Sequence, residues 1–313
     1  MRRAVLYVLV MLFLVTAGQA MCAEKVTIGH LAVVPSLPTY VAMEKGFFIE
    51  QGLQVELVPF QSGTDIVDAL VAGRIDAECM GAITGNWFAA QGAPDKFKIF
   101  LVYGADSNVD NTFAVVVKKA SPLKDLKGLK GKKVGTFPGA TSVALAKAII
   151  RKKTDPAKVI FTEVPPPNMI QALAAGQIDA FFTPEPFGMM AVYQGIGRYL
   201  IKSPCTLLGL KKGIVGGAFS FSAKFLQERP ETAKKVKAAI EKGADFIKTN
   251  EQEARGFLPK YTPLIPPVAA RIPFEKWIKI KDLDKKAPQL YFDVLYKEGA
   301  YQKKIDTTTL YYE

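Results

Sequence analysis

The sequence is poor in the residues that most enzymes use for catalysis. It contains one histidine, His30, and three cysteines among 313 residues. No cluster of histidines and cysteines with metal-ligand spacing and no Ser-His-Asp triad can be assembled from them. Gly195 and Gly197 lack the third glycine and the preceding strand of a dinucleotide-binding loop. We therefore expect no metal and no cofactor, and we interpret His30 as a hydrogen-bonded structural residue at the end of a strand.

Cysteine is equally scarce beyond the first residues of the chain. Cys79 and Cys205 are too few to form a disulfide framework in a chain of this length. An oxidising compartment would allow the two to pair, but buried free thiols are the favoured interpretation.

The first 23 residues follow the pattern of a secretory signal peptide. Arg2 and Arg3 precede an apolar run from Ala4 to Val15, and small residues follow it. The run is shorter than the ~20 residues that span a bilayer core, so export is favoured over a membrane anchor. We expect a periplasmic protein. Cys22 leaves a lipid anchor open, although the residues before it lack the leucine and small residue of a typical lipoprotein site.

The remaining chain is strongly basic. Without Arg2 and Arg3, 39 lysines and arginines face 29 acidic residues, which gives a net charge of +10. Such a balance often indicates nucleic acid, but the lysines between 124 and 133 have no aromatic residues among them, and an exported protein rarely meets nucleic acid. We expect a solvated turn there, no nucleic-acid partner, and a positive field that helps to attract anions.

A nine-residue segment occurs twice. Residues 69–77 and 172–180 agree at seven of nine positions with an offset of 103 residues, which indicates two related supersecondary units. Each copy predicts a short amphipathic helix that ends at a glycine, Gly73 or Gly176, and then a strand that begins at Ile75 or Ile178. Ligands collect beyond the carboxyl ends of strands in open α/β sheets, so the loops at 79–86 and 183–187 are candidate site segments.

Strands and helices alternate around both copies. Strands are expected at 25–29, 53–58, 97–102, 133–136 and 159–164, with helices between them that begin near Ser36, at 62–64, at Val143 and after Asn168 as N-cap. The apolar run at 112–117 should cross into a second lobe, and 216–222 should return as a strand. We therefore assign residues 24–112 and 205–313 to lobe I and 113–204 to lobe II. A long helix should run from Pro230 to about Thr249, and we interpret the tail as helical, interrupted at its prolines and packed against lobe I.

Three strand-to-helix loops carry small residues, at Ser36, at 62–64 and at 139–142. Free backbone N–H groups and hydroxyls at helix N-termini can hold an anionic group. Ordinary N-capping explains any one of them, but three such loops converging between two lobes favour a binding site. Glu185 has no identifiable catalytic partner, so a ligand-holding or hinge role is as reasonable for it as that of a general base.

Several segments together resemble a known family. They are Glu44-Lys-Gly-Phe-Phe, Gly52-Leu-Gln-Val-Glu-Leu, Asp125-Leu-Lys-Gly, Gly131-Lys-Lys-Val-Gly, the second repeat copy and Thr183-Pro-Glu-Pro-Phe. From about Lys25 to Thr249 the chain is similar to the periplasmic solute-binding proteins of the alkanesulfonate, taurine, nitrate and thiamine-precursor transport family. The resemblance implies an α/β, two-lobed periplasmic binding protein (type II-like) with two crossover strands, which acts as a monomer, is not an enzyme and delivers a small molecule to an ABC transporter permease.

The family's ligand-lining loops can be placed on this sequence by position. They correspond to Ser36, Leu37, Pro38, Gly63, Thr64, Gly81, Ala82, Thr84, Gly139, Ala140, Thr141, Ser142, Glu185 and Pro186. Thiamine-pyrimidine binders in the family tend to carry Asn and His in the first loop, where this chain has Pro35-Ser-Leu-Pro38, so a pyrimidine is disfavoured. That loop is unusually apolar for an inorganic anion. An organic sulfonate or carboxylate is therefore expected ahead of nitrate or a thiamine-pyrimidine precursor, and a secreted enzyme that uses Glu185 or His30 is the alternative class.

The signal-peptide pattern makes a prediction about the exported protein. We expect it to begin at Met21 or Glu24 and to carry no lipid, because cleavage after Ala20 or Ala23 fits the small residues there. Intact-mass measurement of the exported form checks this, and a lipid-modified chain that begins at Cys22 would contradict it.

Overall fold

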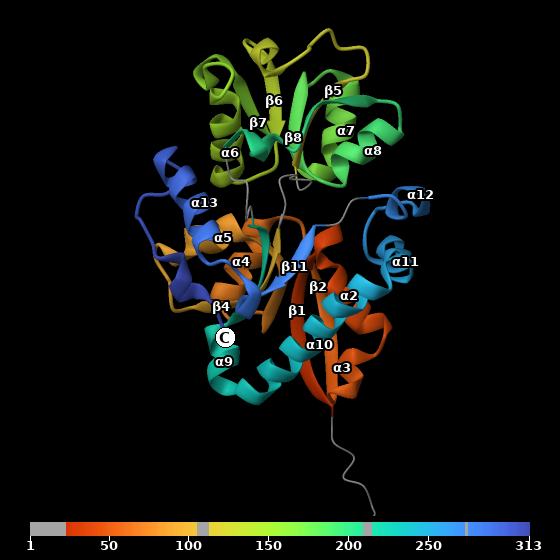
Figure 1. Ribbon diagram of the computed structural model, residues 1–313, viewed down its shortest axis with the longest axis vertical. Coiled ribbons are helices and arrows are strands. Elements are labelled where there is room, and N and C mark those ends of the chain that lie inside the picture. Colours follow the sequence, from red (N-terminus) through yellow and green to blue (C-terminus); the bar gives the residue numbers. More distant parts are fainter. Residues whose placement is uncertain (1–22, 105–112, 209–214, 273–274) are drawn as a thin grey trace, which may run out of the picture.

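The chain builds two sheets, one in each of two lobes stacked along the long axis (Figure 1). The structure, a computed structural model, describes residues 23–104, 113–208, 215–272 and 275–313. The expected signal peptide and Cys22 lie outside these residues. We use lobe I for the part built on the six-stranded sheet A and lobe II for the part built on the five-stranded sheet B. The predicted α/β class is confirmed.

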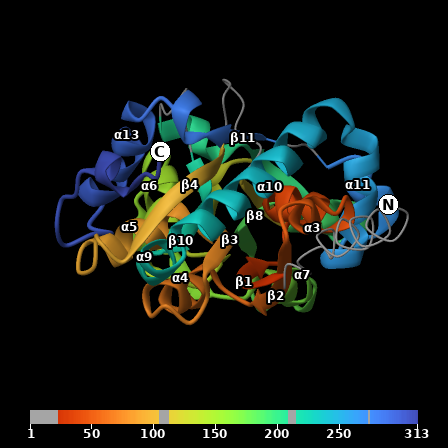
Figure 2. The same cartoon turned by 90° about the horizontal axis from the view of Figure 1, so that it is seen from below.

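Sheet A has the strand order β11-β4-β10-β3-β1-β2. Its strands are β1 (Glu24–Leu31), β2 (Leu53–Phe60), β3 (Ala77–Ala82), β4 (Phe97–Gly104), β10 (Val215–Ser222) and β11 (Lys276–Lys279). One face packs under α2 (Leu37–Glu44), α3 (Phe47–Glu50), α10 (Pro230–Thr249) and α11 (Glu251–Tyr261), and the other under α4 (Gly63–Val71), α5 (Ile83–Ala90) and α13 (Lys286–Lys297). Figure 2 shows α10 crossing the sheet.

Sheet B repeats the plan with the order β7-β6-β8-β5-β9. Its strands are β5 (Phe113–Lys118), β6 (Lys133–Thr136), β7 (Ile160–Glu163), β8 (Ala180–Pro184) and β9 (Gly197–Lys202), with the helices α6 (Ala140–Arg151), α7 (Pro166–Ala175) and α8 (Phe187–Tyr193). The strands β6, β7 and β8 correspond to β1, β2 and β3, because in both sets the first strand lies in the middle and pairs parallel with the other two.

One antiparallel strand in each sheet follows a crossing from the other lobe. The chain leaves β4 in sheet A and enters β5, which lies between β8 and β9 in sheet B. It leaves β9 and enters β10, which lies between β3 and β4 in sheet A. The predicted crossings are therefore confirmed, and the connecting residues 105–112 and 209–214 lie outside the described part of the chain. This is the expected two-lobed, type II-like architecture.

The two repeat copies have the same local structure. Gly73 and Gly176 follow their helices with φ of +65° and +74°, a left-handed conformation that glycine adopts without steric cost. Asp76 accepts a hydrogen bond from Thr27 N at 2.9 Å, and Asp179 accepts one from Lys133 N at 2.8 Å. Each aspartate thus joins the end of its turn to the neighbouring strand, and β3 and β8 begin two residues later than we expected.

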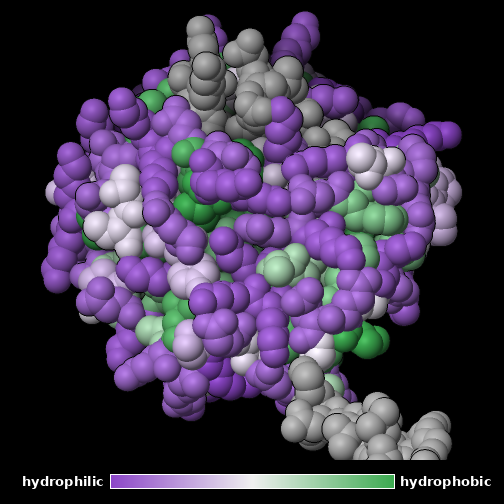
Figure 3. Space-filling view, turned by 60° about the horizontal axis from the view of Figure 1, so that its bottom comes forward, coloured by the Kyte–Doolittle hydropathy of each residue, from purple (hydrophilic) through white to green (hydrophobic). Residues whose placement is uncertain are grey.

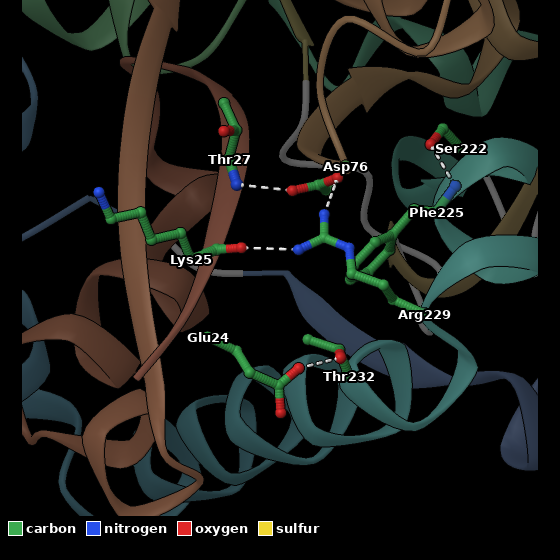
Figure 4. A network of polar contacts seen from close by, with 8 residues as sticks. All are labelled: Glu24, Lys25, Thr27, Asp76, Ser222, Phe225, Arg229 and Thr232. Carbon is green, nitrogen blue, oxygen red and sulfur yellow. Dashed lines mark hydrogen bonds and ion pairs between the residues drawn. The ribbon is translucent and has the colours of Figure 1, made fainter. Parts of the chain in front are cut away.

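Asp76 also anchors the C-terminal part of the chain (Figure 4). Its carboxylate pairs with Arg229, whose guanidinium donates to Lys25 O at 2.7 Å. Arg229 lies between α9 (Ala223–Glu228) and α10, and Ser222 caps α9 by accepting from Phe225 N at 3.1 Å. The first repeat copy therefore holds β1 and the long helix α10 in fixed relation.

The tail differs from its prediction. It contains β11, which pairs antiparallel with β4, and Pro259 lies inside α11 instead of ending it. It also reaches lobe II, because Arg151 in α6 forms an ion pair with Glu298 at 3.0 Å. The N-cap of α7 is Pro165 and not Asn168, since prolines fit the first helical turn without losing a hydrogen bond.

The two cysteines of the described chain agree with the expectation of buried free thiols. Cys79 and Cys205 are both buried and free. In the described part of the chain, no helix combines the length and the apolar character that crossing a membrane requires. The face in Figure 3 is mostly hydrophilic, with separate apolar patches.

A buried carboxyl group lies on β3 itself, in the interior of lobe I. Glu78 is fully buried, and its Oε1 accepts from Asn86 Nδ2 and Ser220 Oγ, each at 2.7 Å. Burial raises the pKa of Glu78 to about 7. A Cβ on Gly81 would lie 2.2 Å from Glu78 Oε2, so the glycine leaves room for this carboxyl.

The glycine ends of α4 and α7 can be tested by substitution. We expect Gly73→Val and Gly176→Val each to lower the free energy of unfolding by roughly 1 kcal/mol or more, because a β-branched residue fits a left-handed conformation poorly. Gly92→Val is a matched control, since a Cβ at Gly92 meets nothing within 4 Å and its φ is not left-handed. Urea unfolding measures all three, and stability equal to the control would contradict the capping role.

Glu78 predicts a pH dependence of stability. Its carboxyl holds a proton more tightly in the folded chain, with a pKa of about 7, than at its usual value of 4.5. The stability linked to the protonated form is therefore complete below about pH 4.5 and is lost as the pH rises through about 7, by roughly 3 kcal/mol in all. We expect Glu78→Gln to flatten this loss between about pH 5 and 8, whereas exposed Glu228→Gln should not. Identical pH profiles of unfolding for wild type and Glu78→Gln would contradict this assignment.

Candidate ligand-binding site

A cavity of about 200 Å³ lies between the lobes. Lobe I contributes the residues after β1, β2 and β3, and lobe II contributes the residues after β6 and β8. Every one of these loops follows the carboxyl end of a strand, which is where open α/β sheets place their ligands. The carboxyl ends of these strands in both sheets therefore face the same cavity.

The cavity wall is mainly apolar and aromatic. Its aromatic residues are Phe60, Tyr103, Phe113, Phe137, Phe187 and Tyr291. Among the described residues that line it, Glu185 is the one charged side chain, and none is Lys, Arg or His. A buried charge without a partner is costly. An anionic ligand would therefore depend on backbone N–H groups and hydroxyls, while the wall suits an organic body.

The loops that begin α4 and α6 approach each other across the cavity. Ser62 caps α4, its hydroxyl accepting from Asp65 N at 3.1 Å. Gly63 is packed so closely that a Cβ there would lie 2.9 Å from the Cβ of Ala82. Gly139 precedes α6 with φ of +118°, which favours glycine. Small residues thus bring backbone from both lobes close to the cavity.

Two hydroxyl groups at the start of α6 have different roles. Thr141 donates to Thr84 Oγ1 at 3.1 Å, which links lobe II to the first turn of α5 in lobe I. The Ser142 hydroxyl lies within hydrogen-bond distance of Phe137 O and of Gly139 O, the latter at 2.7 Å. Ser142 therefore closes its own loop, and Thr141 presents a hydroxyl at the boundary between the lobes.

Glu185 lines the cavity but is already bonded within lobe II. Its carboxylate accepts from Met189 N at 2.9 Å in α8 and from Tyr199 Oη at 2.9 Å. Burial raises the pKa of Glu185 and also that of Tyr199. Its neighbours are thus a backbone amide and a phenol, which hold the carboxylate in place.

His30 has the structural role that we expected. Its ring Nδ1 lies 2.9 Å from Tyr40 Oη, and Tyr40 in turn donates to Leu31 O at 2.9 Å. The side chain is buried, which lowers its pKa, and it does not line the cavity.

The first predicted loop is placed differently. Ser36, Leu37 and Pro38 are fully or almost fully buried and do not line the cavity. Ser36 Oγ donates to Leu31 O at 2.7 Å, and a Cβ on Gly243 in α10 would lie 2.2 Å from Pro38 O. The 3₁₀ turn at Val34–Ser36 directs the chain under α10, so residues 31–35 form this part of the wall instead.

Six of the fourteen residues predicted from sequence line the cavity. They are Gly63, Ala82, Thr84, Thr141, Ser142 and Glu185. Thr64, Gly81, Gly139 and Pro186 lie in the same segments but not in the wall, and the side chain of Ala140 is outside the described part of the structure. The predictions missed most of the aromatic wall, because Tyr103, Phe113 and Tyr291 come from strands and a tail helix with no motif around them. The ligand-binding role of the six stays a prediction.

Comparison with known proteins adds relatives of two kinds. A Bacillus subtilis protein named as a binding protein, YtlA, is 27% identical over 218 residues, which cover 68% of this chain and 63% of that protein. An enzyme of Saccharomyces cerevisiae, 4-amino-5-hydroxymethyl-2-methylpyrimidine phosphate synthase, is 26% identical over 229 residues, which cover 67% of this chain and 63% of that enzyme. The chain thus matches slightly less than two thirds of the length of either relative.

Similarity to solved structures extends over more of the chain than similarity to these two sequences does. The alkanesulfonate-binding protein SsuA from Xanthomonas axonopodis pv. citri, bound to MOPS, is similar with a TM-score of 0.75 at 21% identity, over 92% of this chain and 98% of that one. At this identity the similarity shows the fold alone. Residues 19–257, well over half of the chain, match the family described as NMT1-like, and the chain therefore belongs to the NMT1-like family.

Proposed function

We propose that this protein is the periplasmic substrate-binding component of an ABC importer and captures a small organic molecule between its lobes. The observation that carries the proposal is the cavity itself, which is closed by loops from both lobes and contacts no catalytic constellation in the described residues. We infer that the two lobes rotate relative to each other, so that opening admits the ligand and closing encloses it.

The lining of the cavity favours an organic ligand over nitrate. An inorganic anion would lose its hydration against apolar residues and find no cationic side chain among the described lining residues. A sulfonate or carboxylate with an apolar body would place the body against Phe113 and Phe137 and its head at the start of α6, near Thr141. Burial raises the pKa of Glu185, the charged residue among the described lining residues.

Contacts between the two lobes are already present, and a bound ligand would add to them. Thr141 of lobe II donates to Thr84 at the cavity, and Arg151 in α6 forms an ion pair with Glu298 of the C-terminal tail. Each contact joins the lobes without blocking the wall, so a ligand that bridges the two sets of loops adds to them and favours the closed state.

The alternative of a secreted enzyme that uses Glu185 or His30 finds less support. Glu185 is bonded to Met189 and Tyr199, and His30 is bonded to Tyr40 away from the cavity. Both groups already have hydrogen-bond partners within the fold, which favours a positioning or structural role for each over that of a general base.

A thermal-shift screen tests the proposed function. We expect an organic sulfonate or carboxylate to raise the midpoint and to remain chemically unchanged, while nitrate has little effect; at a hundredfold excess over Kd the gain is about 2.7 kcal/mol. Thr141→Val should weaken binding about twofold to tenfold, because a hydroxyl contact contributes ~0.5–1.5 kcal/mol. Thr162→Val, on β7 outside the cavity, is the matched control.

Each part of the proposal has its own contrary result. Conversion of the stabilising compound into a product would establish an enzyme instead. Affinity unchanged in Thr141→Val, measured by titration calorimetry, would remove the head group from the start of α6. A scattering radius that stays constant on saturation would contradict closure of the lobes.

A further inference from the structure

The excess of positive over negative charge in residues 24–313 lies almost entirely in one lobe. Residues 113–204 contain 14 lysines and arginines against 5 acidic residues, a net charge of +9. The remainder of residues 24–313 contains 25 against 24, a net charge of +1. Lobe I is thus almost neutral, and lobe II carries the excess that the whole sequence shows.

Eight lysines of lobe II gather at the amino ends of β6 and β7, and we name this region the lysine face. Its members are Lys124, Lys127, Lys130, Lys132, Lys133, Lys152, Lys153 and Lys158. Backbone hydrogen bonds hold the contributing segments side by side, from Gly131 N to Lys158 O at 2.7 Å and from Ile160 N to Lys132 O at 3.0 Å. The face forms the outer end of lobe II in Figure 1, whereas the cavity lies at the carboxyl end of β6.

The lysine face has little neutralising charge of its own. Seven of its eight lysines are exposed. The nearby acids Asp125 and Asp155 accept from backbone N–H groups of Lys127 and Ala157, each at 2.9 Å. In the described part of the chain, the ion pair of the face is Lys132 with Asp179 at 3.9 Å, a separation at which an exposed pair contributes little.

The composition of the face identifies the kind of surface that it fits. It consists of lysines on flexible stems with no arginine forks for bidentate recognition, and the face itself contains no aromatic platform on which a base could stack. Ile160, at the centre, is 56% exposed and offers an apolar contact among the charges. Lysines around an apolar residue suit a broad array of phosphates better than a single anion or a nucleic acid.

We propose that the lysine face binds the anionic phospholipid headgroups of a membrane surface. Bound in this way, lobe II would rest on the bilayer by its outer end, with the cavity at the other end of β6, about 13 Å farther along four residues of strand. Ligand exchange at the cavity would continue, since no lysine of the face lines it. The interaction is independent of which ligand the cavity binds.

Vesicle co-sedimentation with the mature chain tests the proposal. We expect binding to phosphatidylcholine vesicles that contain about 30% phosphatidylglycerol, no binding to pure phosphatidylcholine, and release at about 0.5 M salt. The variant Lys127→Gln, Lys130→Gln, Lys153→Gln and Lys158→Gln should bind at least about tenfold more weakly. The control removes the same charge from exposed lysines of lobe I, as Lys96→Gln, Lys224→Gln, Lys281→Gln and Lys297→Gln, and should bind as the wild type does.

The outcomes separate a specific face from net charge. The proposal would be overturned if both variants bound the vesicles equally weakly. It would also be overturned if the wild type did not bind the anionic vesicles at about 0.1 M salt. Binding to polyglutamate or to single-stranded DNA without binding to vesicles would assign the face to another polyanion and overturn the lipid assignment. Circular dichroism and the thermal midpoint of each variant show whether a loss of vesicle binding reflects unfolding. If the fourfold variant of the lysine face unfolds, single substitutions at Lys127 and Lys153 replace it.

Discussion

The return of the chain from sheet B into the middle of sheet A is the constraint on which the remaining structure depends. Strand β10 follows all the strands of sheet B along the chain, yet it lies in the middle of sheet A between β3 and β4. Strand β5 has the same position in sheet B, between β8 and β9. Sheet A therefore cannot form completely until the chain has crossed to sheet B and returned, whereas sheet B is built from the continuous run of strands β5 to β9. The two crossings bring the loops at the carboxyl ends of both sheets to one cavity.

The sequence predicted those features that local interactions determine. The repeat fixed the helix ends at Gly73 and Gly176, because a left-handed cap is specified by a few neighbouring residues. The long helix α10 runs over the residues that its amphipathic pattern indicated. Strand β11 was missed, since four residues paired with β4 from far along the chain carry no periodic signal.

The candidate site was predictable in outline and not in its wall. Loops after strands were the correct places, but Ser36 and Pro38 turn under α10, a contact over a separation of some two hundred residues that no local pattern specifies. Tyr103, Phe113 and Tyr291 line the same cavity only because the chain crossings and the packing of the C-terminal tail bring them together. A motif search finds the small residues that let backbone approach a ligand, whereas tertiary packing selects the side chains that contact its body.

The uneven charge of the lobes bears on how a cavity with apolar walls could receive an anion. Exposed lysines act over about a Debye length, ~8 Å at physiological salt, so the lysine face contributes little to binding at the far end of β6. Affinity must then come from short-range donors such as the start of α6 and Thr141, while the field of lobe II affects only the approach. Electrostatics that act at long range change the association rate and its salt dependence more than the dissociation rate. The two ends of lobe II can therefore serve different partners, because the strand that connects them is long enough to separate their fields.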